Sequence, residues 1–196
     1  MEIVTLVPVG EETLVEIRQL IESMGPSPID VVVVGAEETR LEPSDLYVLK
    51  ISVPVDKYAV VKEVAYAHAV TDPQYAEVWA APPELAADQL AQELSLALLR
   101  RLLDALVAKV DAGLVIERAR PEIVEGDTLL YTLVRTLAVD ASASLAVSGR
   151  VAEALQLLSR LAGHPAYEAY RKFWDFVTSN FKFLPAYNWL LLMYGK

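Results

Sequence analysis

The run IDVVVV at residues 29 to 34 constrains the fold of this chain more than any other feature. Four consecutive valines follow Asp30, and β-branched side chains favour extended backbone. A strand without polar positions is typical of a parallel sheet that helices cover on both faces. We therefore expect residues 29 to 34 to be a central strand in a sheet of at least four mostly parallel strands.

Strand and helix patterns alternate on both sides of this run. Strands are predicted over residues 3–9, 46–55, 75–80 and 114–118. Helices are predicted over residues 13–24, 57–69 and 84–110, and the polar residues 37–45 are predicted to form a loop. This alternation implies right-handed crossovers. It predicts an α/β fold with a mostly parallel, doubly wound, Rossmann-like sheet over residues 1–120.

The strand pattern ends near residues 121–126, and an all-helical C-terminal domain is expected over residues 127–196. Helices are predicted over residues 127–138, 141–147, 149–162 and 166–183, with a last turn near Trp189. Ten of the sixteen aromatic residues lie between Tyr167 and Tyr194, and aromatic side chains are enriched at protein interfaces. We favour packing of this tail against the α/β domain or a second subunit. Docking of a protein partner, base stacking and a membrane-surface helix are the alternatives.

Composition excludes several classes of protein. The chain is 54% hydrophobic, yet no apolar run reaches the roughly 18 residues of a membrane span. We therefore expect a homodimer or larger oligomer, with contacts through residues 84–110 and the aromatic tail. Cysteine is absent, and His68 and His164 lie far apart without a ligand cluster, so we expect no zinc site, no redox function and no cofactor.

The start of the chain and its amide content indicate a source and a compartment. No signal peptide pattern opens the chain, which predicts a cytoplasmic protein. Two Asn and five Gln are few, as in thermophilic proteins, and we expect a thermophilic, archaeal source.

Charge is distributed unevenly along the chain. Residues 1–118 carry 9 Lys/Arg against 20 Asp/Glu, whereas residues 119–196 carry 8 against 7. Phosphate contacts dominate nucleic-acid affinity, so binding of nucleic acid by residues 1–118 is not expected.

The VPVGEET junction is the first place to look for a ligand, because doubly wound sheets bind ligands beyond the carboxyl ends of their strands. No GxGxxG or P-loop motif is present. Glu11 and Glu12 suit the dipole of the following helix but repel a phosphate. We favour a structural turn, with a ligand loop as the alternative. In that alternative the candidate ligand-binding residues are Pro8, Val9, Gly10, Glu11, Gly35, Arg40 and Ala81, and the nearest basic residues are Arg40, Lys50 and Lys57.

The segments MEIVTLVPVG, PIDVVVVGAEET and EVWAAPPELAADQLAQELSLALLRRLL follow one another in an order that resembles the CARF domains of CRISPR-associated sensor proteins. The resemblance covers about residues 1–118 and is one of layout. It implies a dimeric Rossmann-like domain that binds a cyclic oligoadenylate, followed by a helical effector. On this basis we expect a non-enzymatic, regulatory or sensor-like protein with a nucleotide-type ligand.

Two further functions remain as alternatives. The first is a structural or interaction protein whose aromatic tail docks a partner. The second is a nuclease or hydrolase, although no GxSxG motif is present. Arg160 and His164 have a spacing one short of the R-x4-6-H pattern of HEPN ribonucleases, and AGHP predicts a helix end there. Residues 128–163 also resemble a helix-turn-helix, but Arg150 and Arg160 are the basic residues of its second helix, so plain helical packing is favoured.

Overall fold

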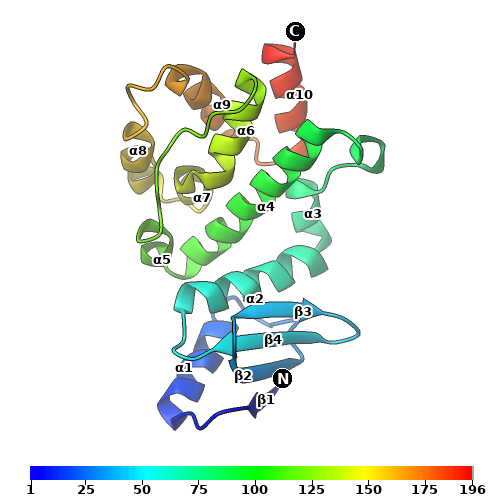
Figure 1. Cartoon of the computed structure of the whole chain (residues 1–196), viewed down its shortest axis with the longest axis vertical. Helices are drawn as coiled ribbons and strands as arrows, with labels where there is room; N and C mark the ends of the chain where they lie inside the picture. The colour runs from blue at the N-terminus through cyan, green and yellow to red at the C-terminus, as the bar shows by residue number, and fades with distance from the viewer. Residues whose placement is uncertain (196) are drawn as a thin grey trace. The chain divides into compact units, whose positions relative to one another are not determined.

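The computed structural model describes residues 1–195, which form two compact units (Figure 1). The first unit is Met1–Pro73 and contains the sheet, and the second begins at Gln74 and is helical. The chain is thus an α/β protein with a helical C-terminal region, as predicted. Along the chain, the boundary between the two units follows Pro73, about fifty residues before the boundary expected from the sequence.

The first unit contains a mixed sheet in the order β1-β2-β4-β3. The pairs β1–β2 and β2–β4 are parallel, and β3 is antiparallel to β4. The valine run therefore forms an interior strand, which confirms that part of the prediction. The elements of this unit are β1 (Glu2–Thr5), α1 (Glu11–Glu22), β2 (Val31–Ala36), β3 (Arg40–Pro43), β4 (Tyr47–Ser52) and α2 (Lys57–Thr71).

Strand β3 lies inside the segment that the sequence predicts to be a loop. It forms a hairpin with β4, in which Leu41 pairs with Leu49. Leu41 is buried, and its backbone N–H donates to Glu63 Oε2 of α2 at 2.8 Å. One buried leucine between Arg40 and Glu42 is too short an alternation to stand out in the sequence. This edge strand makes the sheet mixed rather than mostly parallel.

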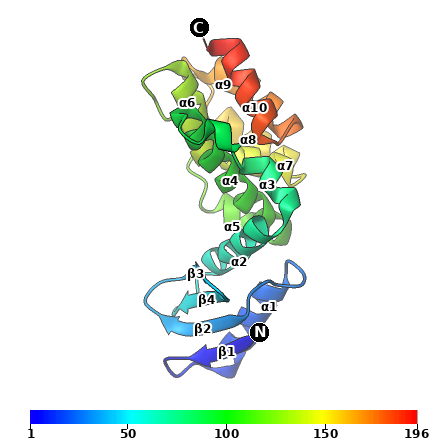
Figure 2. The same ribbon diagram turned by 90° about the vertical axis from the view of Figure 1, so that its right-hand side faces the viewer.

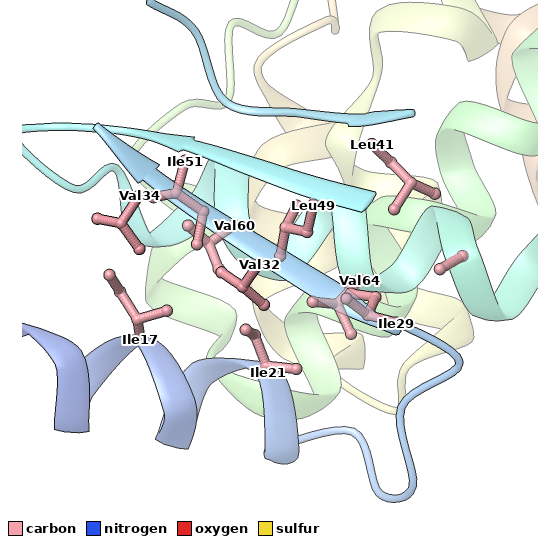
Figure 3. Close-up of a cluster of buried hydrophobic side chains, with 11 residues drawn as sticks. Ile17, Ile21, Ile29, Val32, Val34, Leu41, Leu49, Ile51, Val60 and Val64 are labelled. Carbon is pink, nitrogen blue, oxygen red and sulfur yellow. The ribbon is translucent and has the colours of Figure 1, made fainter. Parts of the chain in front are cut away.

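Both helices of the first unit cover the same face of the sheet. Val32 and Val34 point toward Ile17 and Ile21 of α1 and share one core with Val60 and Val64 of α2 (Figure 3). Side chains alternate across a strand, so Val31 and Val33 face the other way and are half-buried. No helix of Met1–Pro73 covers that second face. The prediction of a doubly wound sheet is therefore wrong, and this unit has two layers.

Two predicted strands are short helices instead. Residues 75–80 lie mostly within α3 (Pro73–Trp79), and residues 114–118 overlap α5 (Ala112–Ile116). Proline is favoured at the first position of a helix, which is where Pro73 stands. The Asp111 side chain accepts from Gly113 N at 2.8 Å and caps α5. Periodicity cannot separate strand from helix in apolar runs this short.

The second unit is built around α4, which packs against α6, α7 and α10 (Figure 2). The long helix begins later than predicted because Asp88 caps it and accepts from Ala91 N at 2.7 Å. The helix predicted over residues 166–183 ends at Ser179, and the turn expected near Trp189 is part of a separate helix that begins at Phe183. The remaining elements are η1 (Pro83–Leu85), α4 (Gln89–Val110), α6 (Leu129–Val139), α7 (Ala141–Val147), α8 (Val151–Ser159), α9 (Tyr167–Ser179) and α10 (Phe183–Tyr194).

Candidate functional sites

The first candidate is the loop between β1 and α1, which the sequence singles out. Gly35 at the end of β2 has a φ of +95°, and a Cβ there would lie 2.6 Å from Val7 Cγ2 of this loop. Val7 thus fills the space beside Gly35. Pro8, Val9 and Gly10 continue the loop, and Glu11 begins α1. This packing supports a structural turn, with Glu11 and Glu12 in the first turn of the helix, where carboxylates are favourable.

The basic side chains named as phosphate partners are all paired with glutamates. Arg40 pairs with Glu38 and, at 2.7 Å, with Glu42. Lys50 Nζ lies 2.8 Å from the same Glu42 carboxylate. The hydrogen bond from Lys50 and the one from Arg40 lower the pKa of Glu42. A phosphate at this site would have to displace these carboxylates from their cations.

Lys57 is paired in the same way. Its Nζ lies 2.7 Å from Glu16 Oε1 of α1. The hollow beside Arg40 measures about 240 Å³, below the roughly 300 Å³ at which small-molecule pockets begin. It is lined by Leu6, Val33, Ala36, Glu37, Glu38, Arg40 and Lys50. The small volume of this hollow, and the pairing of its Arg40 and Lys50 with glutamates, disfavour a nucleotide-type ligand.

Ala81 is the one predicted ligand residue that belongs to the second unit. The first unit holds the others, Pro8 to Glu11, Gly35 and Arg40, at or near the carboxyl ends of β1 and β2. Ala81 lines a different hollow of about 500 Å³ between α3 and the start of α10. The walls of this hollow are mostly apolar, and the Lys182–Glu77 ion pair at 2.6 Å bridges its two sides. Its lining is Ala76, Glu77, Ala80, Ala81, Pro82, Lys182, Phe183, Leu184 and Pro185.

An exposed apolar stripe continues from this hollow along α10. Leu184 belongs to both, and Leu191 and Leu192 follow at helical spacing on the same face. Leu192 is 80% exposed, and Met193 beside it is also exposed. We call the hollow together with Leu184, Leu191, Leu192 and Met193 the α10 surface. No residue between Phe183 and Tyr194 is charged, but the exposed amide of Asn188 lies between Leu184 and Leu192 on this face, so the stripe is apolar on both sides of one polar residue.

The aromatic side chains that drew attention to the tail lie mainly on its inner side. Tyr170, Phe173 and Phe183 are fully buried, and Trp189 stacks on Phe173 at a centroid distance of 5.6 Å. The exposed large apolar residues of the tail are aliphatic instead. The aromatic content of the tail is conspicuous and hides these residues in the sequence, although the run LLLM in α10 could have indicated them.

A buried polar cluster joins α6, α7 and α9 of the second unit. Asp140 accepts from Tyr170 Oη at 2.7 Å, from Ser142 Oγ at 2.5 Å and from Ser142 N at 2.9 Å. Trp174 Nε1 donates to Ser142 Oγ at 2.8 Å. Burial and the Asp140 carboxylate raise the pKa of Tyr170 well above its ordinary value. All four side chains are buried, so the cluster holds helices together and offers no entry to a substrate.

The sites considered for other chemistry are structural in their contacts. His164 Nδ1 accepts from Ala166 N at 3.2 Å in the turn that follows α8. Arg160 caps the end of α8. Among residues 1–195, no three His, Asp or Glu side chains are arranged to hold a metal ion. Within the same residues no single helix has the length and hydropathy of a membrane span, and α6 and α7 reach them only as a pair bent by 66°.

A scan against protein-family models and searches of curated proteins and of solved structures each found no match to this chain.

Proposed function

We propose that this chain is a non-enzymatic interaction protein that docks a protein partner on its α10 surface, and that this partner is a second copy of the chain. The observation that carries the proposal is the continuity of the exposed leucine stripe with the apolar hollow. Contiguous exposed apolar patches mark interaction sites on monomers. A sensor with a nucleotide-type ligand has weaker support, because Val7 fills the β1–α1 turn and every basic candidate is paired with a glutamate.

The burial of most leucines of the long helix α4 favours α10 as the contact between subunits. Residues 84–110 were also expected to contact a second subunit, but a line of leucines along α4 that includes Leu90, Leu94 and Leu98 is buried inside the second unit. The rest of that line, Leu102 and Leu106, is buried as well. Leu96 is the exposed large apolar residue of α4, at 57%, whereas α10 presents Leu184, Leu191, Leu192 and Met193, so α10 offers the larger apolar surface of the two predicted contacts.

Charge selects a second copy as the partner. Residues 1–73 carry 5 Lys/Arg against 13 Asp/Glu, whereas residues 74–196 carry 12 against 14. Two identical chains repel each other least where their charges nearly cancel. The charges of the α10 surface, Glu77 and Lys182, are paired with each other and select no oppositely charged partner, and a twofold axis would bring the leucine stripe against the same stripe of a second copy.

Light scattering at about 10 μM, where a dissociation constant of about 1 μM gives mostly dimer, tests this proposal. We expect the wild type to be a dimer and Leu192→Glu to be a monomer, because the substitution buries an unpaired carboxylate in the interface. The expected loss of affinity is at least about 100-fold. The matched control is Leu155→Glu on α8, an exposed leucine of the same unit, which should leave the dimer intact.

Circular dichroism checks that both variants are folded, which is expected because both side chains are exposed. A wild-type protein that is monomeric at this concentration would overturn the proposal. So would a dimer that Leu192→Glu leaves intact, or one that both substitutions disrupt equally.

A further inference from the structure

The sheet of the first unit has a second face, which neither α1 nor α2 covers and which is independent of α10. Ile3, Val32, Leu49 and Leu41 face the helices, so their neighbours along each strand face the opposite way. In register across the sheet, one row is Val4, Val33, Lys50 and Arg40, and the next is Glu2, Val31, Val48 and Glu42. We call these eight residues the open sheet face.

The centre of the open sheet face is apolar and its edges are charged. Val31, Val33 and Val48 are half-buried at the centre, and Val4 is 39% exposed beside them. Sheets with one face in water normally place polar residues on that face. An apolar centre inside a charged rim is instead the composition of a protein–protein interface.

The rim carries an excess of negative charge. Glu2 stands at one edge, and Glu37, Glu38 and Glu42 surround the other. Arg40 and Lys50 are the cations of this face, and both are already paired with these glutamates. The whole unit has eight more acidic than basic residues, 13 against 5. A second copy would bring the same negative face, and a nucleic acid would bring phosphates, so both are repelled.

We propose that the open sheet face binds a basic, amphipathic segment of a protein partner. Apolar side chains of this segment cover the central valines, and its Lys or Arg side chains meet the glutamates of the rim. Charge complementarity sets the choice of partner and the rate of association, and burial of the valines contributes most of the affinity.

A synthetic peptide that alternates Lys and Leu is the probe, with a Lys-Ser and a Glu-Leu peptide of equal length as controls. NMR of the valine methyl groups locates its binding. We expect the methyl signals of Val4, Val33 and Val48 to shift. Val15 on the acidic helix α1 is exposed and Val32 lies in the core, so neither should shift. The control peptides should bind at least about tenfold more weakly, since one lacks the apolar side chains and the other the positive charge.

A double variant, Val4→Thr with Val33→Thr, tests the apolar centre without changing side-chain shape or β-propensity. It should weaken binding of the Lys-Leu peptide by about tenfold, because each replaced methyl group removes on the order of 0.8 kcal/mol of burial. The matched control is Val15→Thr, an exposed valine of the same unit, and it should change nothing.

Three results would overturn this proposal. Equal binding of the Lys-Leu and Lys-Ser peptides would mean that charge alone attracts the probe. A shift of Val15 without Val4 and Val33 would place the peptide on α1. Dissociation of the protein's own dimer by the double variant would show that a second copy covers the open sheet face.

Discussion

The two units of the chain place their polar groups in opposite ways. The core cluster of the first unit is entirely aliphatic, and its many carboxylates lie at the surface or are partly exposed. Among residues 1–195, the polar and charged side chains that are buried all belong to the second unit. They are Arg101, Asp104, Thr132, Thr136, Asp140, Ser142 and Ser144. The first unit thus keeps its charges at the surface, whereas the second unit buries polar groups that hydrogen-bond between its helices.

The reason for this difference lies in the backbone. Strand pairing satisfies the backbone groups of the sheet in the first unit, whereas the second unit has an irregular connection over residues 119–128. Buried threonine side chains accept hydrogen bonds from the backbone N–H groups of that connection. Thr132 Oγ1 accepts from Gly126 N at 2.9 Å, and Thr136 Oγ1 accepts from Val124 N at 3.1 Å. Buried backbone groups need such partners, because leaving them unpaired is costly.

The largest effect that separates the two units is expected from Asp140→Ala. The substitution removes the buried acceptor of three donors, which are Tyr170 Oη, Ser142 Oγ and Ser142 N. We expect it to lower the free energy of unfolding by about 3–5 kcal/mol. The matched change in the first unit is Asp30→Ala. Asp30 also accepts a backbone N–H, from Tyr47 at 2.9 Å, but it is exposed, so the loss should stay within about 1 kcal/mol.

Urea unfolding can resolve the two units, because all three tryptophans, at positions 79, 174 and 189, lie in the second unit. Tryptophan fluorescence should show the Asp140→Ala loss. Asp140→Asn keeps an acceptor for Tyr170 and should lose less. Equal losses for Asp140→Ala and Asp30→Ala would break the contrast between the units.

A smaller effect is expected from Gly35→Ala, and it should stay within the first unit. Gly25 and Gly35 have φ values of +94° and +95°, a region that costs a side chain about 1–2 kcal/mol. A Cβ meets nothing at Gly25 but lies 2.6 Å from Val7 at Gly35. We expect Gly25→Ala to lower the free energy of unfolding by about 1 kcal/mol and Gly35→Ala by about 2–3 kcal/mol. Circular dichroism measures both, and equal losses would mean that Val7 does not fill the turn.

The sequence predicted the elements with a strong local signal and missed those that depend on distant contacts. The valine run gave an interior strand and DASASLAV gave α7 at its observed bounds. A continuous apolar run is apolar on both faces of a strand, so it does not show whether helices cover one face or two. For this reason the sheet was expected to be doubly wound. Leu41 in β3 is buried in one core with α2 and bonds to Glu63, 22 residues later in the chain, so the short run RLEP carries no local signal.

The candidate site was predicted from a general rule for α/β sheets, and this rule explains which of its residues lie near one another. Gly35 and Arg40 lie near the carboxyl end of β2, where that rule places a ligand. The rule does not predict side-chain contacts, so it could not indicate that Val7 packs on Gly35 or that Glu38 and Glu42 pair with Arg40. Such contacts are set by side-chain packing across strands and loops. Ala81 was grouped with these residues because residues 75–80, just before it, were predicted to be a strand. These residues lie mostly in helix α3 instead.

The smallest effect is a pH dependence carried by His68 of α2 in the first unit. Its Nε2 is buried without a hydrogen-bond partner among the described residues. Burial lowers its pKa below the ordinary 6.5, and Asp72 partly opposes this shift. The folded unit therefore binds this proton less tightly than the unfolded chain, and its stability falls as pH drops below about 6.5 toward the lowered pKa.

Glu63 on the same helix has a pKa raised by burial, so its protonation acts in the opposite direction as pH falls further toward 4.5. Solvent screening keeps the His68 contribution below about 1 kcal/mol. We expect His68→Gln to flatten the stability of the first unit between pH 6.5 and the lowered pKa, as measured by circular dichroism during urea unfolding. The tryptophan transition should not change with this substitution, because His68 belongs to the other unit. An equal change in the circular dichroism and tryptophan transitions would show that the two units do not unfold independently.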